Sequence, residues 1–441
     1  MFLLSLLTKN RSRRFLSKKN KITGQSVRGL LTFAPEFKDY EMDNCQEIST
    51  SGKSTKDNII SICVFLSGFS CFAQLYYFQP LLPDLAHEFN LSASYSSLAI
   101  SFSTLGMVIG LFTAMFVADS IPRKNLISAA LLSSSVASVI CSYSNSFFLL
   151  VALSALKGFL LSGATSVSLA YISEEVLPKN KGKITGLYIA GNALGGMGGR
   201  VISSYLSTEF SWRTASASIG VLCAVFAILF LIFSPRSINF KPKKENFKSL
   251  IISNLHLLTS AKLLPFYLIG SLMLGIFVSL YNYLGFYLVK EPFNFPDYLI
   301  HYIYFMYIFG VFGSIATAKL TARYNHFKIQ KTIVLSSVAA LLLLYVNNFW
   351  IVTLGLAIFT FNFFVVHVIC NRVVSDYNLQ KRSVTISIYL LFYYMGSSVW
   401  GSATGVVLDN FGWQWFIATL IALTFILYAI AYRGARLMRE N

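Results

Sequence analysis

The sequence has 441 residues, of which 55% are hydrophobic and only 12% are charged, and its mean hydropathy is +0.62. These values exclude an ordinary soluble domain and indicate a protein that crosses a membrane several times. The net charge of +18 would suggest a nucleic-acid partner in a soluble protein. In a membrane protein the location of the charge matters more than its size, and we predict no nucleic-acid partner.

Residues 1–58 differ in composition from the rest of the chain. A short apolar run is followed by a basic run, which reverses the order found in a signal peptide. An acidic patch from Glu36 to Glu47 argues against a transit peptide. We predict a disordered cytoplasmic arm, with an over-long predicted start as the alternative.

From Asn58 onward, apolar stretches long enough to cross a hydrocarbon core of about 30 Å follow one another. They lack the period-two alternation of barrel strands, so the backbone must satisfy its hydrogen bonds within helices. We therefore predict an all-α membrane protein with twelve transmembrane helices, at residues 59–79, 93–117, 126–141, 147–172, 184–206, 212–233, 263–289, 297–317, 332–346, 349–369, 384–407 and 412–432.

All but four of the 36 lysine and arginine residues fall on one side of the membrane when the N-terminus is placed in the cytoplasm. Arg213 and Lys290 fall outside, and Lys157 and Arg200 fall within the membrane. The positive-inside rule predicts this asymmetry for an even number of spans, so we expect both termini to be cytoplasmic.

The longest cytoplasmic loop, residues 234–262, divides the spans into two six-helix bundles, at 59–233 and 263–432, with a cytoplasmic tail at 433–441. The fifth and eleventh spans suggest a duplication at one constant offset, in which Tyr188, Gly195 and Trp212 correspond to Tyr389, Gly396 and Trp413. Transporters built from two such pseudo-repeats bind substrate at the repeat interface, near the membrane midplane.

The fifth span contains the glycine-rich stretch GLYIAGNALGGMGGR, residues 186–200. Gly191, Gly195, Gly198 and Gly199 line one face of a helix, and two overlapping GxxxG steps let a neighbouring helix approach closely. The spacing is not GxGxxG and no strand precedes it, so we predict a helix-packing seam rather than a phosphate-binding loop.

Two basic residues lie within the predicted spans, whereas no aspartate or glutamate lies deep in any of them. Lys157 lies about 15 Å into the fourth span, where burial costs about 2.5 to 3.5 kcal/mol, so we predict that it faces a watery cavity and binds an anionic group of the substrate or titrates. The alternative is a structural role, paired with backbone carbonyls or a polar neighbour. Arg200 is nearer the outer surface, to which its side chain can extend, so we predict a structural role for it, with a functional role as the alternative.

Five polar or aromatic residues are predicted to bind substrate together with Lys157: Tyr76, Gln79, Asn192, Tyr281 and Asn282. Helix packing is the alternative for each of them. The sequence has no metal-ligand spacing, so we predict no metal site and no cofactor.

Several stretches resemble the major facilitator superfamily, in particular its YnfM-like branch of drug and sugar exporters. They are YYFQPLLPDLAHEFNLS (residues 76–92), AYISEEVLP (170–178) and the glycine-rich stretch of the fifth span. The likeness covers most of residues 59–432, and it implies the major facilitator fold.

The stretch MFVADSIPRK is similar to the loop signature between the second and third helices of this superfamily, and AKLTARYN is similar to its weaker copy in the second half. By resemblance, this loop clasps helix ends on the cytoplasmic side and stabilises one access state. The residues predicted to form the gate are Asp119, Arg123 and Lys124 in the first copy, Arg323 in the second, and Glu174 and Glu175 at the end of the fourth helix. Solvated helix-end charge is the alternative for the two glutamates.

The resemblance implies a monomeric secondary active transporter, rather than an enzyme, in the lipid bilayer of the bacterial inner membrane. It implies export of a small solute (drug-like, sugar or organic anion) by proton antiport with alternating access. GNALGG is similar to the end of an antiporter motif in helix five, with Asn192 in place of proline. The alternatives are an importer or facilitator of a small metabolite, a transporter-like sensor, and a membrane-embedded transferase, which would need a cluster of Asp, Glu or His that the loops lack.

Overall fold

The structure, a computed structural model, describes three stretches of the chain, residues 35–242, 256–378 and 382–438. Only the backbone is described at residues 35–54, 297–298 and 382–383. Contacts divide the chain into two units, Met1–Lys56 and Asp57–Asn441, of which the second contains the apolar spans. The predictions for residues 1–34, for residues 243–255 of the central loop and for the last three residues of the tail lie outside the described residues.

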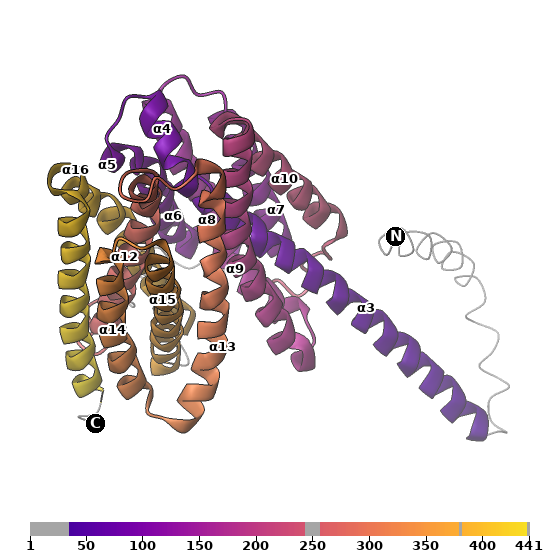
Figure 1. The fold of residues 1–441 in the computed structure, drawn as a ribbon. Helices are drawn as coiled ribbons and strands as arrows, with labels where there is room; N and C mark the ends of the chain where they lie inside the picture. The colour runs from indigo at the N-terminus through magenta and orange to yellow at the C-terminus, as the bar shows by residue number, and fades with distance from the viewer. Residues whose placement is uncertain (1–34, 243–255, 379–381, 439–441) are drawn as a thin grey trace. The chain divides into compact units, whose positions relative to one another are not determined.

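The described residues form a succession of helices, which confirms the predicted all-α fold (Figure 1). The first predicted half contains α3 (Pro35–Tyr76), η1 (Gln79–Leu81), α4 (Leu82–Glu88), α5 (Ala93–Ser96), α6 (Leu98–Val117), η2 (Ala118–Ser120), α7 (Arg123–Cys141), α8 (Phe147–Glu175), α9 (Pro178–Glu209) and α10 (Trp212–Phe233). The second contains α12 (Leu264–Val289), η3 (Asp297–Met306), α13 (Tyr307–Arg323), α14 (His326–Leu342), η4 (Leu343–Tyr345), α15 (Phe349–Tyr377) and α16 (Arg382–Leu437).

Ten helical runs among the described residues are long and apolar enough to cross a membrane, against twelve predicted spans. One difference is α9, which carries the predicted fifth span but is less apolar, because it begins with lysines and is rich in glycine. The other is α16, which counts once although its backbone leaves helical geometry at Gly412 (φ 80°, ψ −177°). That break separates the predicted spans 384–407 and 412–432, and each predicted span overlaps a described helix.

Disorder is predicted for residues 1–58, and the structure describes the second part of that arm as helical, since α3 begins at Pro35 and continues to Tyr76. The apolar residues after Asn58 form a helix, and extending an existing helix costs much less than nucleating a new one. The acidic stretch before the span is therefore helical.

Within each half, the helices approach one another at glycines. A Cβ added at Gly106 in α6 would lie 2.8 Å from the carbonyl carbon of Ala155 in α8. A Cβ at Gly396 in α16 would lie 2.5 Å from the carbonyl carbon of Ser271 in α12. Only glycine leaves room for backbones this close, as is typical of helices packed in a membrane. Figure 1 shows α12, α14, α15 and α16 side by side, and α16 contacts each of the other three.

The predicted glycine seam of α9 lies against α3. Three of its members face the α3 backbone, Gly191 at Phe65, Gly195 at Phe69 and Gly199 at Ala73. Gly198 faces the ring of Phe69, where an added Cβ would lie 3.2 Å from the ring edge. The backbone contacts advance by four residues on both helices, so the two helices run in contact over two full steps of the seam.

Candidate functional site

The first apolar span ends where several of the predicted substrate-binding residues lie. α3 ends at Tyr76, and the turn η1 contains Pro80, which has no backbone N–H with which to continue the helix. The side chain of Gln79 is buried here against the second half. Its Nε2 donates to Asn282 Oδ1 at 2.6 Å and to the carbonyl oxygen of Val278 at 3.2 Å. One side chain of the first half thus bonds to α12 of the second.

Arg200 joins this contact from α9. Its Nε donates to Gln79 Oε1 at 2.5 Å, and its Nη1 donates to the carbonyl oxygen of Gly196 at 2.5 Å. The guanidinium lies against two rings, with Cζ 4.5 Å from the centroid of Tyr76 and 4.4 Å from that of Tyr307. Arg200 is only 2% exposed. Its side chain does not extend to the outer surface, because the ring faces and Gln79 hold the charge inside.

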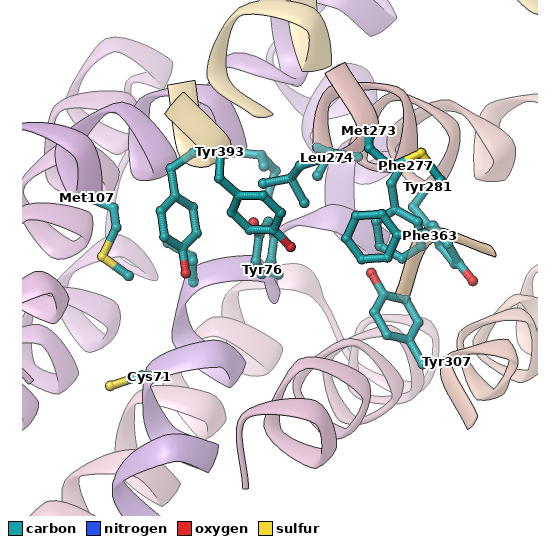
Figure 2. Close-up of a cluster of buried hydrophobic side chains, with 14 of the residues drawn as sticks. Cys71, Tyr76, Met107, Met273, Leu274, Phe277, Tyr281, Tyr307, Phe363 and Tyr393 are labelled. Atoms are coloured by element: carbon teal, nitrogen blue, oxygen red, sulfur yellow. The ribbon is translucent and has the colours of Figure 1, made fainter. Parts of the chain in front are cut away.

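Aromatic side chains of the second half surround Tyr307. Phe277 stacks on Phe363 with centroids 3.9 Å apart, and the ring of Tyr281 lies 4.8 Å from that of Tyr307. The Tyr281 hydroxyl lies 2.9 Å from Thr360 Oγ1. The Tyr307 hydroxyl points inward, toward the other labelled rings (Figure 2), and finds no hydrogen-bond partner among the described residues. The cluster therefore combines apolar walls with one unsatisfied polar group.

A second set of contacts between the halves, absent from the predictions, lies where the start of α6 meets α16. Ser402 Oγ lies 2.8 Å from Ser97 Oγ and 2.6 Å from Ser101 Oγ. The Tyr283 hydroxyl lies 2.9 Å from Ser97 Oγ. Ser97 and Ser101 are four residues apart and share a helix face, which is the signal in the sequence that could have indicated this contact.

Lys157 lies within the first half and is fully buried, so the watery cavity predicted beside it is not open in this conformation. Its Nζ lies 4.2 Å from the ring centroid of Tyr77 and 4.5 Å from that of Phe78. It has no hydrogen-bond partner among the residues that the structure describes. Ring faces therefore provide the described contacts of this ammonium. Its contact with substrate stays a prediction.

The structure brings four of the predicted substrate-binding residues together around Arg200 and Tyr307: Tyr76, Gln79, Tyr281 and Asn282. Asn192 lies apart from them, where α9 packs against Gly68 of α3. Arg200 and Tyr307 were not among the predicted binding residues. The lone arginine was visible in the sequence, but nothing there indicated which ring would cover it.

Arg123 links the predicted gating residues at the other ends of the helices. Its Nη2 lies 2.7 Å from Asp119 Oδ1 and 3.1 Å from Glu174 Oε1, and its Nη1 donates to the carbonyl oxygen of Ala118 at 2.8 Å. Its Cζ lies 4.8 Å from the ring centroid of Phe240. The side chain thus ties the end of α8 to the turn between α6 and α7.

The remaining predicted gating residues differ from one another in their contacts. Lys124 Nζ donates to the carbonyl oxygen of Ser234 at 2.5 Å, and Glu175 Oε1 accepts from the backbone N–H of Asn239 at 2.8 Å. Arg323 is exposed at the end of α13, and it takes part in none of the ion pairs found between described residues. The gating contacts described thus lie within the first half and the start of the central loop.

Two cavities lie away from the Arg200 group. One of about 460 Å³ lies in the second half and includes Arg372 and Asp376 in its lining. The other, of about 590 Å³, includes Asp84 and Glu88. Across the described ranges, no group of His, Cys, Asp and Glu side chains could hold a metal ion.

Comparison with known proteins gives matches over most of the chain. A family model described as the Major Facilitator Superfamily matches residues 61–378. The chain is 36% identical over 383 residues to an uncharacterized transporter of Buchnera aphidicola subsp. Schizaphis graminum, covering 86% of this chain and 91% of that protein. It is 32% identical over 382 residues to the inner membrane transport protein YnfM of Escherichia coli, again covering 86% of this chain and 91% of that protein.

A solved structure also matches. It is a bacterial homologue of the human lysosomal transporter Spinster, in an inward-facing and occupied conformation. The TM-score is 0.72 at 13% identity, and the match covers 86% of this chain and 97% of that chain. At this identity the likeness supports the fold alone.

Proposed function

The chain belongs to the major facilitator superfamily, and from this premise we propose that it exports a small solute across the bacterial inner membrane in exchange for protons. Membership makes it a multi-pass membrane transporter of a small solute. Direction, coupling ion and mechanism are the proposed part. In this proposal both termini lie in the cytoplasm, as the distribution of basic residues predicts.

The observation that carries the proposal is the double contact between the two halves. Gln79 bonds to Asn282, and Ser97 bonds to Ser402. Ser97 immediately precedes α6, whose beginning is predicted to lie on the outer side. Contacts at this end hold the outer side closed, so the halves must separate there before a solute can leave the cell. Alternating access by rocking one half against the other requires such a reversible contact.

The proposed substrate contacts are the residues that meet at this junction. Tyr76 and Gln79 belong to the first half, and Tyr281 and Asn282 belong to the second. Because they pack against one another while the halves are joined, rocking would expose them to a solute. Asn192, one turn along α9 from Gly196, is proposed as a more peripheral contact.

The coupling site requires a group that can change its charge, and carboxylates are absent from the interior of the predicted spans. We assign this role to Lys157. Burying an unpaired charge is costly, and ring faces compensate for that cost only in part, by about 2 kcal/mol. Movement of the neighbouring helices changes the surroundings of the ammonium, so gain or loss of its proton can be tied to the rocking step.

Everted membrane vesicles would test direction and coupling together. With an acidic interior, vesicles that contain the protein should take up the exported compound, assayed with ethidium, lactose and benzenesulfonate as three chemical classes. One-to-one exchange for a neutral solute under one pH unit supports about tenfold accumulation, because one unit corresponds to ~1.4 kcal/mol. Nigericin, which collapses the pH gradient, should abolish that accumulation. Protein-dependent uptake that nigericin leaves unchanged would remove the coupling claim.

A further inference from the structure

The Arg200 side chain has hydrogen-bonding capacity that the protein does not use. A guanidinium carries five N–H donors, and the hydrogen bonds of Arg200 to described residues occupy two of them, at Gln79 and Gly196. None of the ion pairs between described residues includes Arg200. A buried cation without a counter-ion is unusual, because burying charge is costly unless it is paired. An acceptor with negative charge would complete the contacts of this guanidinium.

Tyr307 supplies an independent observation at the same place. Its ring lies under the guanidinium, 4.4 Å from Cζ, and the residue is 7% exposed. Its hydroxyl is buried without a described hydrogen-bond partner. A buried hydroxyl normally finds a partner, since leaving it unsatisfied costs about 1–3 kcal/mol. Two neighbouring side chains therefore both carry hydrogen-bond donors that no described residue accepts.

The side chains around Arg200 and Tyr307 indicate what kind of molecule could carry the negatively charged acceptor. Phe277 lies 5.4 Å from Tyr307 and stacks on Phe363, and Tyr281 lies 4.8 Å from Tyr307. Figure 2 shows these rings gathered on the side toward which the Tyr307 hydroxyl points. Aromatic walls favour an apolar, planar body and give little to a hydrated inorganic anion.

We propose that Arg200 and Tyr307 bind the carboxylate of an aromatic organic acid, whose ring packs among Phe277, Tyr281 and Phe363. Arg200 supplies charge-assisted hydrogen bonds, which an amide of the same shape cannot match. This inference rests on the proposed function and narrows its substrate to an organic anion. Lys157 is the rival anion-binding group, but the rings that its ammonium contacts, Tyr77 and Phe78, both belong to the first half.

The test is ligand-induced stabilisation of the full-length purified protein, with benzoate and benzamide as probes of nearly equal shape and different charge. A ligand that binds only the folded protein raises its thermal midpoint, and the rise grows with the logarithm of the ratio of free ligand to Kd. We expect benzoate to raise the midpoint of the wild type and benzamide to have little effect. Arg200→Gln should weaken benzoate binding by about tenfold or more, equivalent to ~1.4 kcal/mol, and Tyr307→Phe should weaken it less. Gly186→Ala, an exposed change at which the added Cβ meets no atom within 4 Å, should respond to benzoate as the wild type does.

Two results would overturn the assignment. One is that benzoate and benzamide stabilise the wild type equally, or that neither of them stabilises it. The other is loss of the benzoate response in Lys157→Met but not in Arg200→Gln. Tyr307→Phe removes a single oxygen, so it keeps the test decisive if Arg200→Gln does not fold. The measurement reports binding, so it separates this site from the proposed function. Selective benzoate binding without transport would uphold the site and contradict export. Transport without anion selectivity would uphold export and contradict the site.

Discussion

Gly195→Ala is expected to destabilise the protein severely. The added Cβ would lie 2.6 Å from the Cα and 2.7 Å from the carbonyl carbon of Phe69. Both atoms belong to the α3 backbone, so no side-chain rotation can relieve the overlap, and α3 and α9 must move apart along the seam. Overpacking of this kind costs about 1–3 kcal/mol. Thermal unfolding of the purified protein in detergent measures the loss.

Gly186→Ala is the matched control in the same helix. Gly186 is exposed, and a Cβ added there meets no atom within 4 Å. The substitution should leave the midpoint unchanged or raise it slightly, because alanine is favoured over glycine in a helix by about 1 kcal/mol. If the two alanine variants unfold at the same temperature, then the seam does not hold α3 and α9 together as described.

Lys157→Met is expected to raise the stability of the protein and to abolish proton-coupled transport. Methionine fills a similar volume without a charge, and removal of an uncompensated buried ammonium relieves its desolvation cost. Loss of the contacts with Tyr77 and Phe78 offsets part of the gain, which leaves an expected stabilisation of about 1–3 kcal/mol. Thermal unfolding and gradient-driven uptake, measured on the same preparations, report the two effects.

Ser154→Ala is the control for Lys157→Met, because Ser154 is a buried polar residue one turn away on α8. It should change neither property much. A stable Lys157→Met protein that still responds to the pH gradient would exclude Lys157 from coupling. A variant that loses both stability and uptake would instead indicate that the ammonium is structural.

The sequence predicted the helices well, because their signal is local. Apolar runs depend on neighbouring residues, and each predicted span overlaps a described helix. The glycine spacing of α9 is also a local signal. It predicted that another helix packs closely against α9, but not that this helix is α3. The polar composition of residues 35–58 favours disorder, whereas an adjoining span can extend a helix through such residues, as α3 does in the structure.

The candidate site was less predictable, because it depends on contacts between distant segments. The depth of Arg200 along its helix could be counted, but the direction of its side chain could not. Tyr307, more than a hundred residues later in the chain, covers the guanidinium, and Gln79 accepts from it. Ser97, at the start of α6, likewise meets Ser402 of α16. The spacing of Ser97 and Ser101 indicates a polar helix face, but no periodicity identifies Ser402 as its partner.

The central claim is that the two halves must separate at their predicted outer ends during transport, and a reversible cross-link tests it most directly. The Oγ atoms of Ser97 and Ser402 are 2.8 Å apart, so a Ser97→Cys, Ser402→Cys double variant places two thiols near disulfide distance, about 2.05 Å between sulfurs. The described native cysteines are all buried and free, and the two single variants control for oxidation elsewhere. Oxidation should stop uptake into everted vesicles only in the double variant, and dithiothreitol should restore it. The account would be contradicted if protein shown to be cross-linked took up the solute as fast as the dithiothreitol-treated protein.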